Sequence, residues 1–184
     1  MNSIIEIKDV SKAFGGVIAN QSISINVAEG GITGLIGPNG SGKTTLFNSI
    51  VGHHPIDSGS IKFEGAEIST FKVQQIARLG LLRTFQQTRI YSKMNCVQNM
   101  LISIPHRTSG ILDMFKAHSP ETNERALELL RFVGLFSNRN LIAGDLSFGQ
   151  QKLLEFAMAL MNEPKVLLLD EPTAGINPTL LNGL

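Results

Sequence analysis

The amino-acid sequence predicts an α/β fold from three patterns of apolar and polar residues along the chain. Residues 4–8 and 22–27 alternate apolar and polar side chains, as strands with one buried face do in an antiparallel sheet. Residues 32–36 form a short apolar run before a glycine-rich turn, and a helical run follows from Thr44. Residues 166–169 are wholly apolar and flanked by turn residues, which predicts a central parallel strand buried on both faces.

The middle of the chain has the pattern of helices. Residues 97–104 and 121–135 are predicted to be helical, the second with an apolar stripe along one face. Gly134 is expected to stop that second helix, because glycine readily adopts the left-handed conformation that ends helices. Residues 105–119 are predicted to be a loop that exposes the apolar segment Ile111–Phe115 as a docking surface for a partner, although this segment can also belong to the core.

Length and composition favour one packed domain rather than a disordered chain. Of 184 residues, 42% are apolar and 17% are charged, and the net charge of +1 gives no electrostatic footprint for nucleic acid. Cys96 is the single cysteine, which excludes an internal disulfide and fits a reducing compartment. The most apolar stretch, Leu153–Met161, is too short to span a bilayer, and the N-terminus lacks the pattern of a secretory signal. We therefore expect a cytosolic location.

The sharpest local signal is the segment at residues 37–45, which reads GPNGSGKTT and matches the pattern G-x-x-x-x-G-K-[ST]. Its glycines let the backbone curl so that successive N–H groups point at phosphate oxygens. The helix that begins near Thr44 adds the positive end of its dipole. Lys43 supplies a point charge to the outer phosphates, and the Thr44 hydroxyl is a hard oxygen ligand for Mg²⁺. The pattern predicts a phosphate-binding loop of the P-loop NTPase type.

Two carboxylates follow the apolar run at residues 166–169. Asp170 is placed at the carboxyl end of a buried strand, where ligands bind in open α/β sheets. We expect Asp170 to belong to the Mg²⁺ shell and Glu171 to polarise the attacking water. The alternative is an acidic helix N-cap after an ordinary strand.

A second candidate anion site lies at residues 146–152, which read LSFGQQK before a strongly helical run. Ser147 is a good N-cap residue, and Gly149 allows close approach of a backbone. The N-terminus of this helix can therefore meet a phosphate, although an ordinary capped helix explains the same residues.

GPNGSGKTT, LSFGQQ and KVLLLDEP, in this order, resemble the nucleotide-binding subunit of ABC transporters, and the resemblance covers the whole chain. It implies a P-loop NTPase (RecA-like) core with an N-terminal antiparallel β layer and an inserted helical subdomain. The expected division is a core of residues 1–88 and 150–184, with the helical subdomain at 89–149. The segments that most resemble the branched-chain amino-acid uptake ATPases are residues 83–86 (RTFQ), 99–101 (NML), 146–152 and 174–178 (AGINP).

The resemblance also implies roles for individual residues. Gln86 aligns with a glutamine that reaches Mg²⁺ and the attacking water and links the site to the transmembrane partner. Ser147, Gly149 and Gln150 align with a signature that contacts the ATP held by the opposite subunit of a head-to-tail dimer. Lys43, Gln86 and Glu171 are thus the expected catalytic residues, and Thr44, Gln86 and Asp170 are the expected Mg²⁺ ligands. The expected nucleotide contacts are Phe14, Asn39, Gly40, Ser41, Gly42, Lys43, Thr44, Thr45, Ser147, Gly149 and Gln150.

Several of these positions admit a plainer interpretation. Phe14 aligns with the aromatic residue that stacks on adenine, but it can instead pack into the N-terminal sheet. His53 and His54 are adjacent and have no nearby ligand cluster, so a solvated loop is predicted for them. Cys96 lies in an apolar stretch, which predicts buried packing rather than reactivity. Phe148 and Asn177 stand where many relatives have glycine and aspartate, and the branched-chain group tolerates both.

The resemblance implies ATP and Mg²⁺ as cofactors and several protein partners. They are a second ABC ATPase subunit (identical or different), transmembrane permease subunits and, indirectly, a substrate-binding protein, with no nucleic acid. The expected location is peripheral, on the cytoplasmic face of the membrane. The family carries a further histidine beyond the paired carboxylates, whereas thirteen residues without histidine follow Glu171. We therefore expect a single ABC ATPase domain, residues 1–184, that is incomplete at its C-terminus.

The predicted function is an ATP-hydrolysing subunit that energises an importer of branched-chain or other amino acids. A first alternative is a truncated nucleotide-binding fragment with little or no turnover. A second is a non-transport ABC ATPase acting on ribosomes or DNA, which the near-neutral charge and the lack of sustained heptads disfavour. A P-loop kinase or GTPase would have no role for LSFGQQ.

Overall fold

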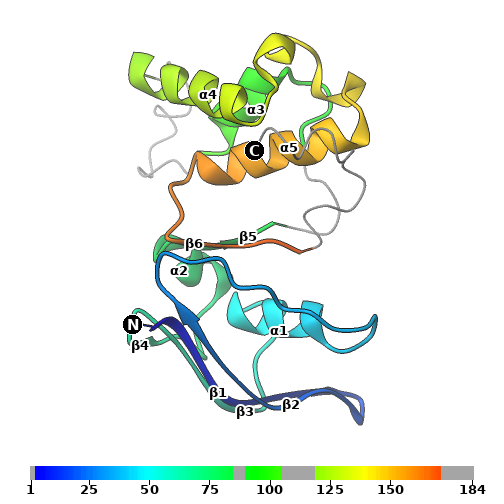
Figure 1. Cartoon of the computed structure of the whole chain (residues 1–184), viewed down its shortest axis with the longest axis vertical. Helices are drawn as coiled ribbons and strands as arrows, with labels where there is room; N and C mark the ends of the chain where they lie inside the picture. Colours follow the sequence, from blue (N-terminus) through cyan, green and yellow to red (C-terminus); the bar gives the residue numbers. More distant parts are fainter. Residues whose placement is uncertain (1–2, 85–89, 105–118, 171–184) are drawn as a thin grey trace. The chain divides into compact units, whose positions relative to one another are not determined.

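A computed structural model describes residues 3–84, 90–104 and 119–170 of the chain, and residues 1–2, 85–89, 105–118 and 171–184 are outside the description (Figure 1). The chain divides into two compact units, Met1–Leu82 and Arg83–Leu184. Each unit is described by itself.

The first unit is built on a four-stranded antiparallel sheet with the strand order β2-β1-β3-β4. Its strands are β1 (Ser3–Phe14), β2 (Val17–Ala28), β3 (Ser58–Phe63) and β4 (Ala66–Glu67). The long hairpin of β1 and β2 turns at Gly15 and Gly16, whose φ angles of 52° and 89° suit the tight two-residue turns of twisted hairpins. The predicted antiparallel N-terminal layer is confirmed.

Alternation along β1 gives this sheet one buried face. Ile5 and Ile7 are at most 3% exposed and lie opposite Phe63 and Ile61 on β3, which are equally buried. Glu6, between the two isoleucines, points to the solvent side. Burying each of these large apolar side chains stabilises the fold by about 1.5–3 kcal/mol.

Two helices complete the first unit. Helix α1 (Lys43–Ile50) contacts β2 and buries Leu46 and Ile50, as the helical pattern from Thr44 predicted. Helix α2 (Val73–Arg78) buries Ile76.

The strand predicted at residues 32–36 is wrong, because the structure has no strand there. Ile32 and Ile36 are fully exposed, at 105% and 95%, and among the described residues no strand pairs with this segment. A strand needs hydrogen-bonded neighbours for its backbone, and apolar side chains alone do not supply them.

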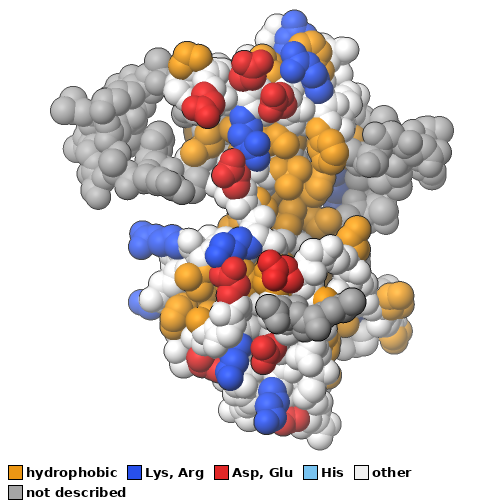
Figure 2. Space-filling model, turned by 60° about the vertical axis from the view of Figure 1, so that its left-hand side comes forward, with side chains coloured by type: hydrophobic (Ala, Val, Ile, Leu, Met, Phe, Trp, Pro, Cys, Tyr) orange, Lys and Arg blue, Asp and Glu red, His pale blue; other side chains and the backbone are white. Residues whose placement is uncertain are grey.

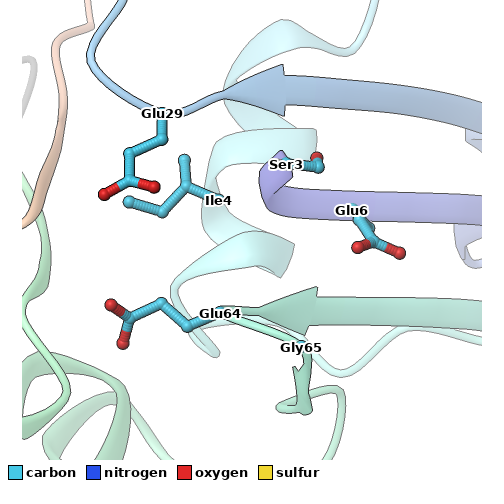
Figure 3. Close-up of a pocket in the computed structure, with 6 residues that line it drawn as sticks. All are labelled: Ser3, Ile4, Glu6, Glu29, Glu64 and Gly65. Atoms are coloured by element: carbon cyan, nitrogen blue, oxygen red, sulfur yellow. The ribbon is translucent and has the colours of Figure 1, made fainter. Parts of the chain in front are cut away.

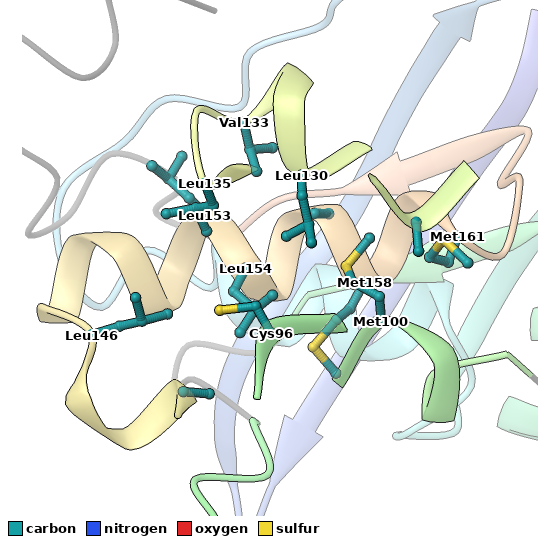
Figure 4. Close-up of a cluster of buried hydrophobic side chains, with 13 residues drawn as sticks. Cys96, Met100, Leu130, Val133, Leu135, Leu146, Leu153, Leu154, Met158 and Met161 are labelled. Carbon is teal, nitrogen blue, oxygen red and sulfur yellow. The ribbon is translucent and has the colours of Figure 1, made fainter. Parts of the chain in front are cut away.

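The described residues of the second unit form the helices α3 (Cys96–Ile102), α4 (Pro120–Phe132) and α5 (Phe148–Leu160), with short 3-10 turns η2 (Phe136–Asn138) and η3 (Ala143–Asp145). Figure 4 shows their shared core, to which all three helices contribute. The buried cluster comprises Cys96, Met100, Ala126, Leu130, Val133, Leu135, Ala143, Leu146, Leu153, Leu154, Ala157, Met158 and Met161. Cys96 is fully buried, as predicted, and burial raises the pKa of its thiol.

Local sequence signals set the ends of α4. Ser119 Oγ accepts a hydrogen bond from the Thr122 N–H at 3.1 Å, and Pro120 occupies the first helical position. At the other end Gly134 has a φ of 72°, and the Leu135 N–H donates to Leu130 O at 2.7 Å. This bond and the left-handed glycine form the Schellman ending, so the predicted stop at Gly134 is confirmed.

The predicted strand at residues 166–169 is present as β6 (Val166–Leu168), which pairs with β5 (Leu81–Arg83). The Thr84 N–H also donates to Leu168 O at 3.0 Å. All three residues of β6 are only partly buried, so the prediction of a central strand buried on both faces is wrong for the described chain. The described residues give this strand a single hydrogen-bonded neighbour.

Two sequence-based expectations are not tested by the described residues. The division into a core of residues 1–88 and 150–184 and an inserted subdomain at 89–149 stays a prediction. The apolar segment Ile111–Phe115 lies outside the described residues. Within the described ranges no helix combines the length and apolar character that crossing a bilayer requires.

Candidate functional site

The phosphate loop before α1 has a backbone that only glycine can follow at Gly42. Its φ is 86°, and a Cβ there would lie 2.2 Å from Ala19 O on the neighbouring strand β2. Gly40 also has a positive φ, of 80°, and the Ser41 N–H donates to Pro38 O at 3.2 Å. The loop is therefore curled tightly just before the helix, as the glycine spacing predicted.

Lys43 closes this loop. Its Nζ donates to Gly37 O and to Pro38 O, each at 2.8 Å, so the ammonium group lies within the curl. The first turn of α1 carries no acidic residue, which leaves the positive end of the helix dipole uncompensated there. This loop concentrates backbone N–H groups and a cation, and that arrangement suits the phosphates of a nucleotide.

The other predicted loop residues lie at or near the surface. Asn39, Gly40, Ser41 and Thr44 are exposed, and Thr45 is half-buried. An exposed Thr44 on the first turn of the helix fits the hard oxygen ligand expected for Mg²⁺.

Asn20 was not predicted as a site residue, yet it supports the loop from β2. It is 5% exposed, and its Nδ2 donates to Gly42 O at 3.2 Å. Gly42 O also accepts from the Leu46 N–H at 2.9 Å in the first turn of α1. Sequence position gave no signal for this contact, because the register of the hairpin and the packing of α1 on β2 together create it.

Phe14 lies at the end of β1 and is 43% exposed. The alternative in which its ring fills the core of the sheet does not fit this exposure. Its ring makes a T-shaped contact with the ring of His54, with centroids 5.2 Å apart, and the Lys12 ammonium lies 5.3 Å from the Phe14 centroid. His53 is exposed, as predicted for a solvated loop, whereas the contact of His54 with Phe14 was not foreseen.

Asp170 is paired with an arginine in the second unit. Arg83 Nη2 lies 2.7 Å from Asp170 Oδ2, and the two side chains are 6% and 8% exposed. Buried charges are tolerated when they are paired in this way. Arg83 was noted in the sequence only as part of the segment that carries the family resemblance, and its pairing with Asp170 was not predicted. Gln86 and Glu171, the other residues expected around the reacting phosphate, lie outside the described residues.

The signature segment forms a capping box at the start of α5. Ser147 Oγ accepts from the Gln150 N–H at 3.3 Å, and Gln150 Oε1 accepts from the Ser147 N–H at 3.0 Å. The predicted N-cap role of Ser147 is confirmed. Gly149 is buried, while Phe148 is 55% exposed with the Lys152 ammonium 5.5 Å from its ring centroid. Contact of these residues with a nucleotide stays a prediction.

A pocket of about 390 Å³ in the first unit has the wrong charge for phosphates. Figure 3 shows its lining, in which Glu29 and Glu64 point to the same side and Glu6 lies on β1. Three carboxylates would repel a nucleotide. Over the described residues of the face drawn in Figure 2, lysine and arginine side chains are interspersed with acidic ones, consistent with the net charge of +1.

The sheet-and-helix fold and the curled loop define the class of protein, a P-loop nucleotide-binding protein. The profile of the family described as "ABC transporter" matches residues 20–174. The chain belongs to the ABC transporter ATPase family.

Curated relatives and solved structures agree with this membership. The chain is 38% identical to the high-affinity branched-chain amino acid transport ATP-binding protein BraF of Pseudomonas aeruginosa, over 95% of this chain and 71% of that protein. It is 39% identical to the probable branched-chain amino acid transport ATP-binding protein LivG of Archaeoglobus fulgidus, over 98% of this chain and 72% of that protein.

Two crystal structures of ATP-binding cassettes from ABC transporters superpose on the chain with a TM-score of 0.84. The nucleotide-free one is 35% identical, over 99% of this chain and 74% of that chain. The other, in its ADP conformation, is 34% identical over 100% of this chain and 74% of that chain. The predicted fold class and family are confirmed.

Proposed function

We propose that this chain is the ATP-binding and ATP-hydrolysing subunit of an ABC importer for branched-chain or other amino acids. The observation that carries the proposal is the curled phosphate loop, in which Lys43 closes onto Gly37 O and Pro38 O at the N-terminus of α1. The substrate class comes from the relatives, because BraF and LivG are named as branched-chain amino acid transport proteins.

In phosphoryl transfer, some residues of this chain bind the phosphates and others activate the attacking water. Lys43 and the loop N–H groups bind the β- and γ-phosphates and neutralise charge that develops in the transition state. The Glu171 carboxylate accepts a hydrogen bond from the attacking water and polarises it. Gln86 orients the same water for in-line attack on the γ-phosphate. Phe14 stacks on the nucleobase, while Asn39, Gly40, Ser41, Gly42 and Thr45 line the phosphates.

The donor set fits a bound Mg²⁺ ion. Thr44 offers a hydroxyl oxygen, Asp170 a carboxylate and Gln86 an amide oxygen, which are the hard ligands that Mg²⁺ prefers. When bound, the ion supplies positive charge to the outer phosphates. The Asp170 carboxylate is fixed in a buried position by its ion pair with Arg83, whose Nη2 lies 2.7 Å from Asp170 Oδ2.

The active unit is a head-to-tail dimer with a second ATPase subunit, identical or different. Ser147, Gly149 and Gln150 at the N-terminus of α5 meet the γ-phosphate held by the opposite subunit. Transmembrane permease subunits receive the energy of hydrolysis at the cytoplasmic face of the membrane, and a substrate-binding protein delivers the amino acid to them.

Glu171→Gln tests the proposal, because it removes the base and keeps the size of the side chain. The variant should bind ATP like the parent chain and lose steady-state phosphate release. Glu163→Gln, which removes an exposed carboxylate in the same unit, is the control and should change neither measurement. Unchanged hydrolysis in Glu171→Gln would contradict the assignment, and ATP binding without release in the parent chain would favour a nucleotide-binding chain with little turnover.

A further inference from the structure

Asp57, in the loop that follows α1, is hydrogen-bonded to the three residues of β1 that precede Phe14, namely Ser11, Lys12 and Ala13. Asp57 Oδ1 is 2.8 Å from the Lys12 ammonium, and Asp57 Oδ2 accepts from the Ala13 N–H at 2.7 Å. The Asp57 N–H in turn donates to Ser11 O at 2.9 Å. Both carboxylate oxygens and the backbone N–H of Asp57 therefore bind the part of β1 that directly precedes Phe14.

The same hairpin is tied to the other end of α1. Lys12 and Asn20 lie opposite each other in the pairing of β1 with β2. Lys12 reaches Asp57 beyond the C-terminus of α1, and Asn20 reaches Gly42 O at its N-terminus, with Nδ2 at 3.2 Å. One cross-strand pair thus bridges both ends of the helix that follows the phosphate loop.

The ring of Phe14 is contacted by two residues that belong to the same arrangement around Asp57. His54 lies on the same loop as Asp57, and its ring meets Phe14 edge to face at 78°. The Lys12 ammonium, which Asp57 holds, lies 5.3 Å from the Phe14 centroid. A ring that is 43% exposed would otherwise rotate among rotamers, and these neighbours limit that freedom.

The ion pair itself adds little stability. Asp57 is 47% exposed in its side chain, and ion pairs at such positions contribute weakly because water screens them. Its geometric effect is larger, since it sets the backbone of Ala13, one residue before Phe14.

We infer that Asp57, through Lys12 and Ala13 and together with His54, is a positioning residue that holds Phe14 as a platform for the base of a nucleotide whose phosphates occupy the loop before α1. This inference rests on the proposed function, which assigns the base to Phe14. It predicts that Asp57 affects recognition of the nucleobase and leaves recognition of phosphate alone.

Equilibrium binding of ATP and of inorganic tripolyphosphate to the full chain separates these two parts. Base stacking on Phe14 should make ATP bind more tightly than tripolyphosphate, and Phe14→Ala should weaken ATP binding about tenfold. Asp57→Asn should weaken ATP binding about 3- to 10-fold and leave tripolyphosphate binding unchanged. In the Phe14→Ala background, Asp57→Asn should have no further effect, because its action passes through the ring.

Two further variants serve as a second probe of the Phe14 ring and as a control. His54→Ala removes the contact with the Phe14 ring without changing the ion pair of Lys12 and Asp57, and it should also lower the affinity for ATP. Glu163→Gln removes the exposed pair with Arg125, whose atoms lie 3.3 Å apart, and should change neither affinity.

Equal losses for ATP and tripolyphosphate in Asp57→Asn would overturn the inference, as would an undiminished effect of that change in the Phe14→Ala background. A parent chain that binds neither compound would contradict the proposed function instead. A parent chain that binds both equally would leave the phosphate loop standing and overturn the base platform.

Discussion

Asn99 holds Tyr91 by two hydrogen bonds: its Oδ1 accepts from the Tyr91 N–H at 2.7 Å, and its Nδ2 donates to Tyr91 O at 3.1 Å. The same Nδ2 lies 3.3 Å from Met94 O and 3.0 Å from Asn95 O, and the residue is fully buried. Asn99 therefore fixes the shape of residues 91–95, which lie a few positions after Gln86.

The loop at 91–95 is also bonded to the segment before the signature. The Ala143 N–H donates to Met94 O at 2.8 Å, and the Gly144 N–H donates to Ser92 O at 3.0 Å. A Cβ on Gly144 would lie 2.9 Å from Ser92 O, so glycine permits this approach. One buried amide thus supports backbone that leads toward the N-terminus of α5.

Asn99→Ala should lower the free energy of unfolding by about 1–3 kcal/mol, because it removes the side-chain hydrogen bonds of a buried residue and leaves the Tyr91 N–H without its acceptor. Urea denaturation followed by circular dichroism measures the loss. Asn140→Ala, at an exposed position, is the control and should change stability by less than about 0.5 kcal/mol. Similar losses in the two variants would show that Asn99 does not organise this loop.

Gly42→Ala should weaken ATP binding roughly tenfold or more, about 1.4 kcal/mol at least. The new Cβ would lie 2.2 Å from Ala19 O and 2.6 Å from Asn20 Nδ2, so the phosphate loop must move. Gly30→Ala separates this clash from backbone strain, since Gly30 has a φ of 71° and nothing within 4 Å of the Cβ position. It should cost about 1–2 kcal/mol of stability and leave ATP affinity unchanged. Isothermal titration calorimetry of both variants decides between clash and strain.

Local signals predicted much of this fold because they act over a few residues. The alternation at residues 4–8 specified a half-buried strand, and Ser119, Gly134 and Ser147 marked helix ends that the structure has. The phosphate loop was also predictable, since its conformation depends on its own glycines.

Features that depend on distant partners were missed or wrong. Arg83 and Asp170 are 87 positions apart, and no local pattern pairs them. Asp57 and Lys12 are 45 positions apart, and the alignment of β1 with the loop after α1 brings them together. The apolar run at residues 32–36 had the composition of a strand, but strand formation depends on neighbours that composition does not reveal.

Ser147→Ala should have two separate consequences. Loss of the cap should cost about 1 kcal/mol of stability, because the Gln150 N–H loses its acceptor at 3.3 Å. If Ser147 also meets the nucleotide of the opposite subunit, steady-state phosphate release should fall about tenfold or more. Ser119→Ala removes an equivalent cap from α4 and is the matched control, with a similar loss of stability and unchanged release. Equal loss of release in both variants would show that the cap, and not nucleotide contact, limits activity.

The contribution of Asp57 to stability should disappear in acid. The hydrogen bond from the Lys12 ammonium, and then the one from the Ala13 N–H, lower the pKa of Asp57 below its ordinary value. Because the folded pKa lies below the unfolded one, the stabilisation is fully present above about pH 4, the ordinary range of aspartate, and is lost as pH falls through the lower folded value. The difference in free energy of unfolding between the parent chain and Asp57→Asn should therefore be constant from pH 7 to about pH 5 and shrink below about pH 4. Urea titrations at several pH values measure it, with Glu163→Gln as the exposed control, and a difference that grows toward low pH would contradict the assigned direction.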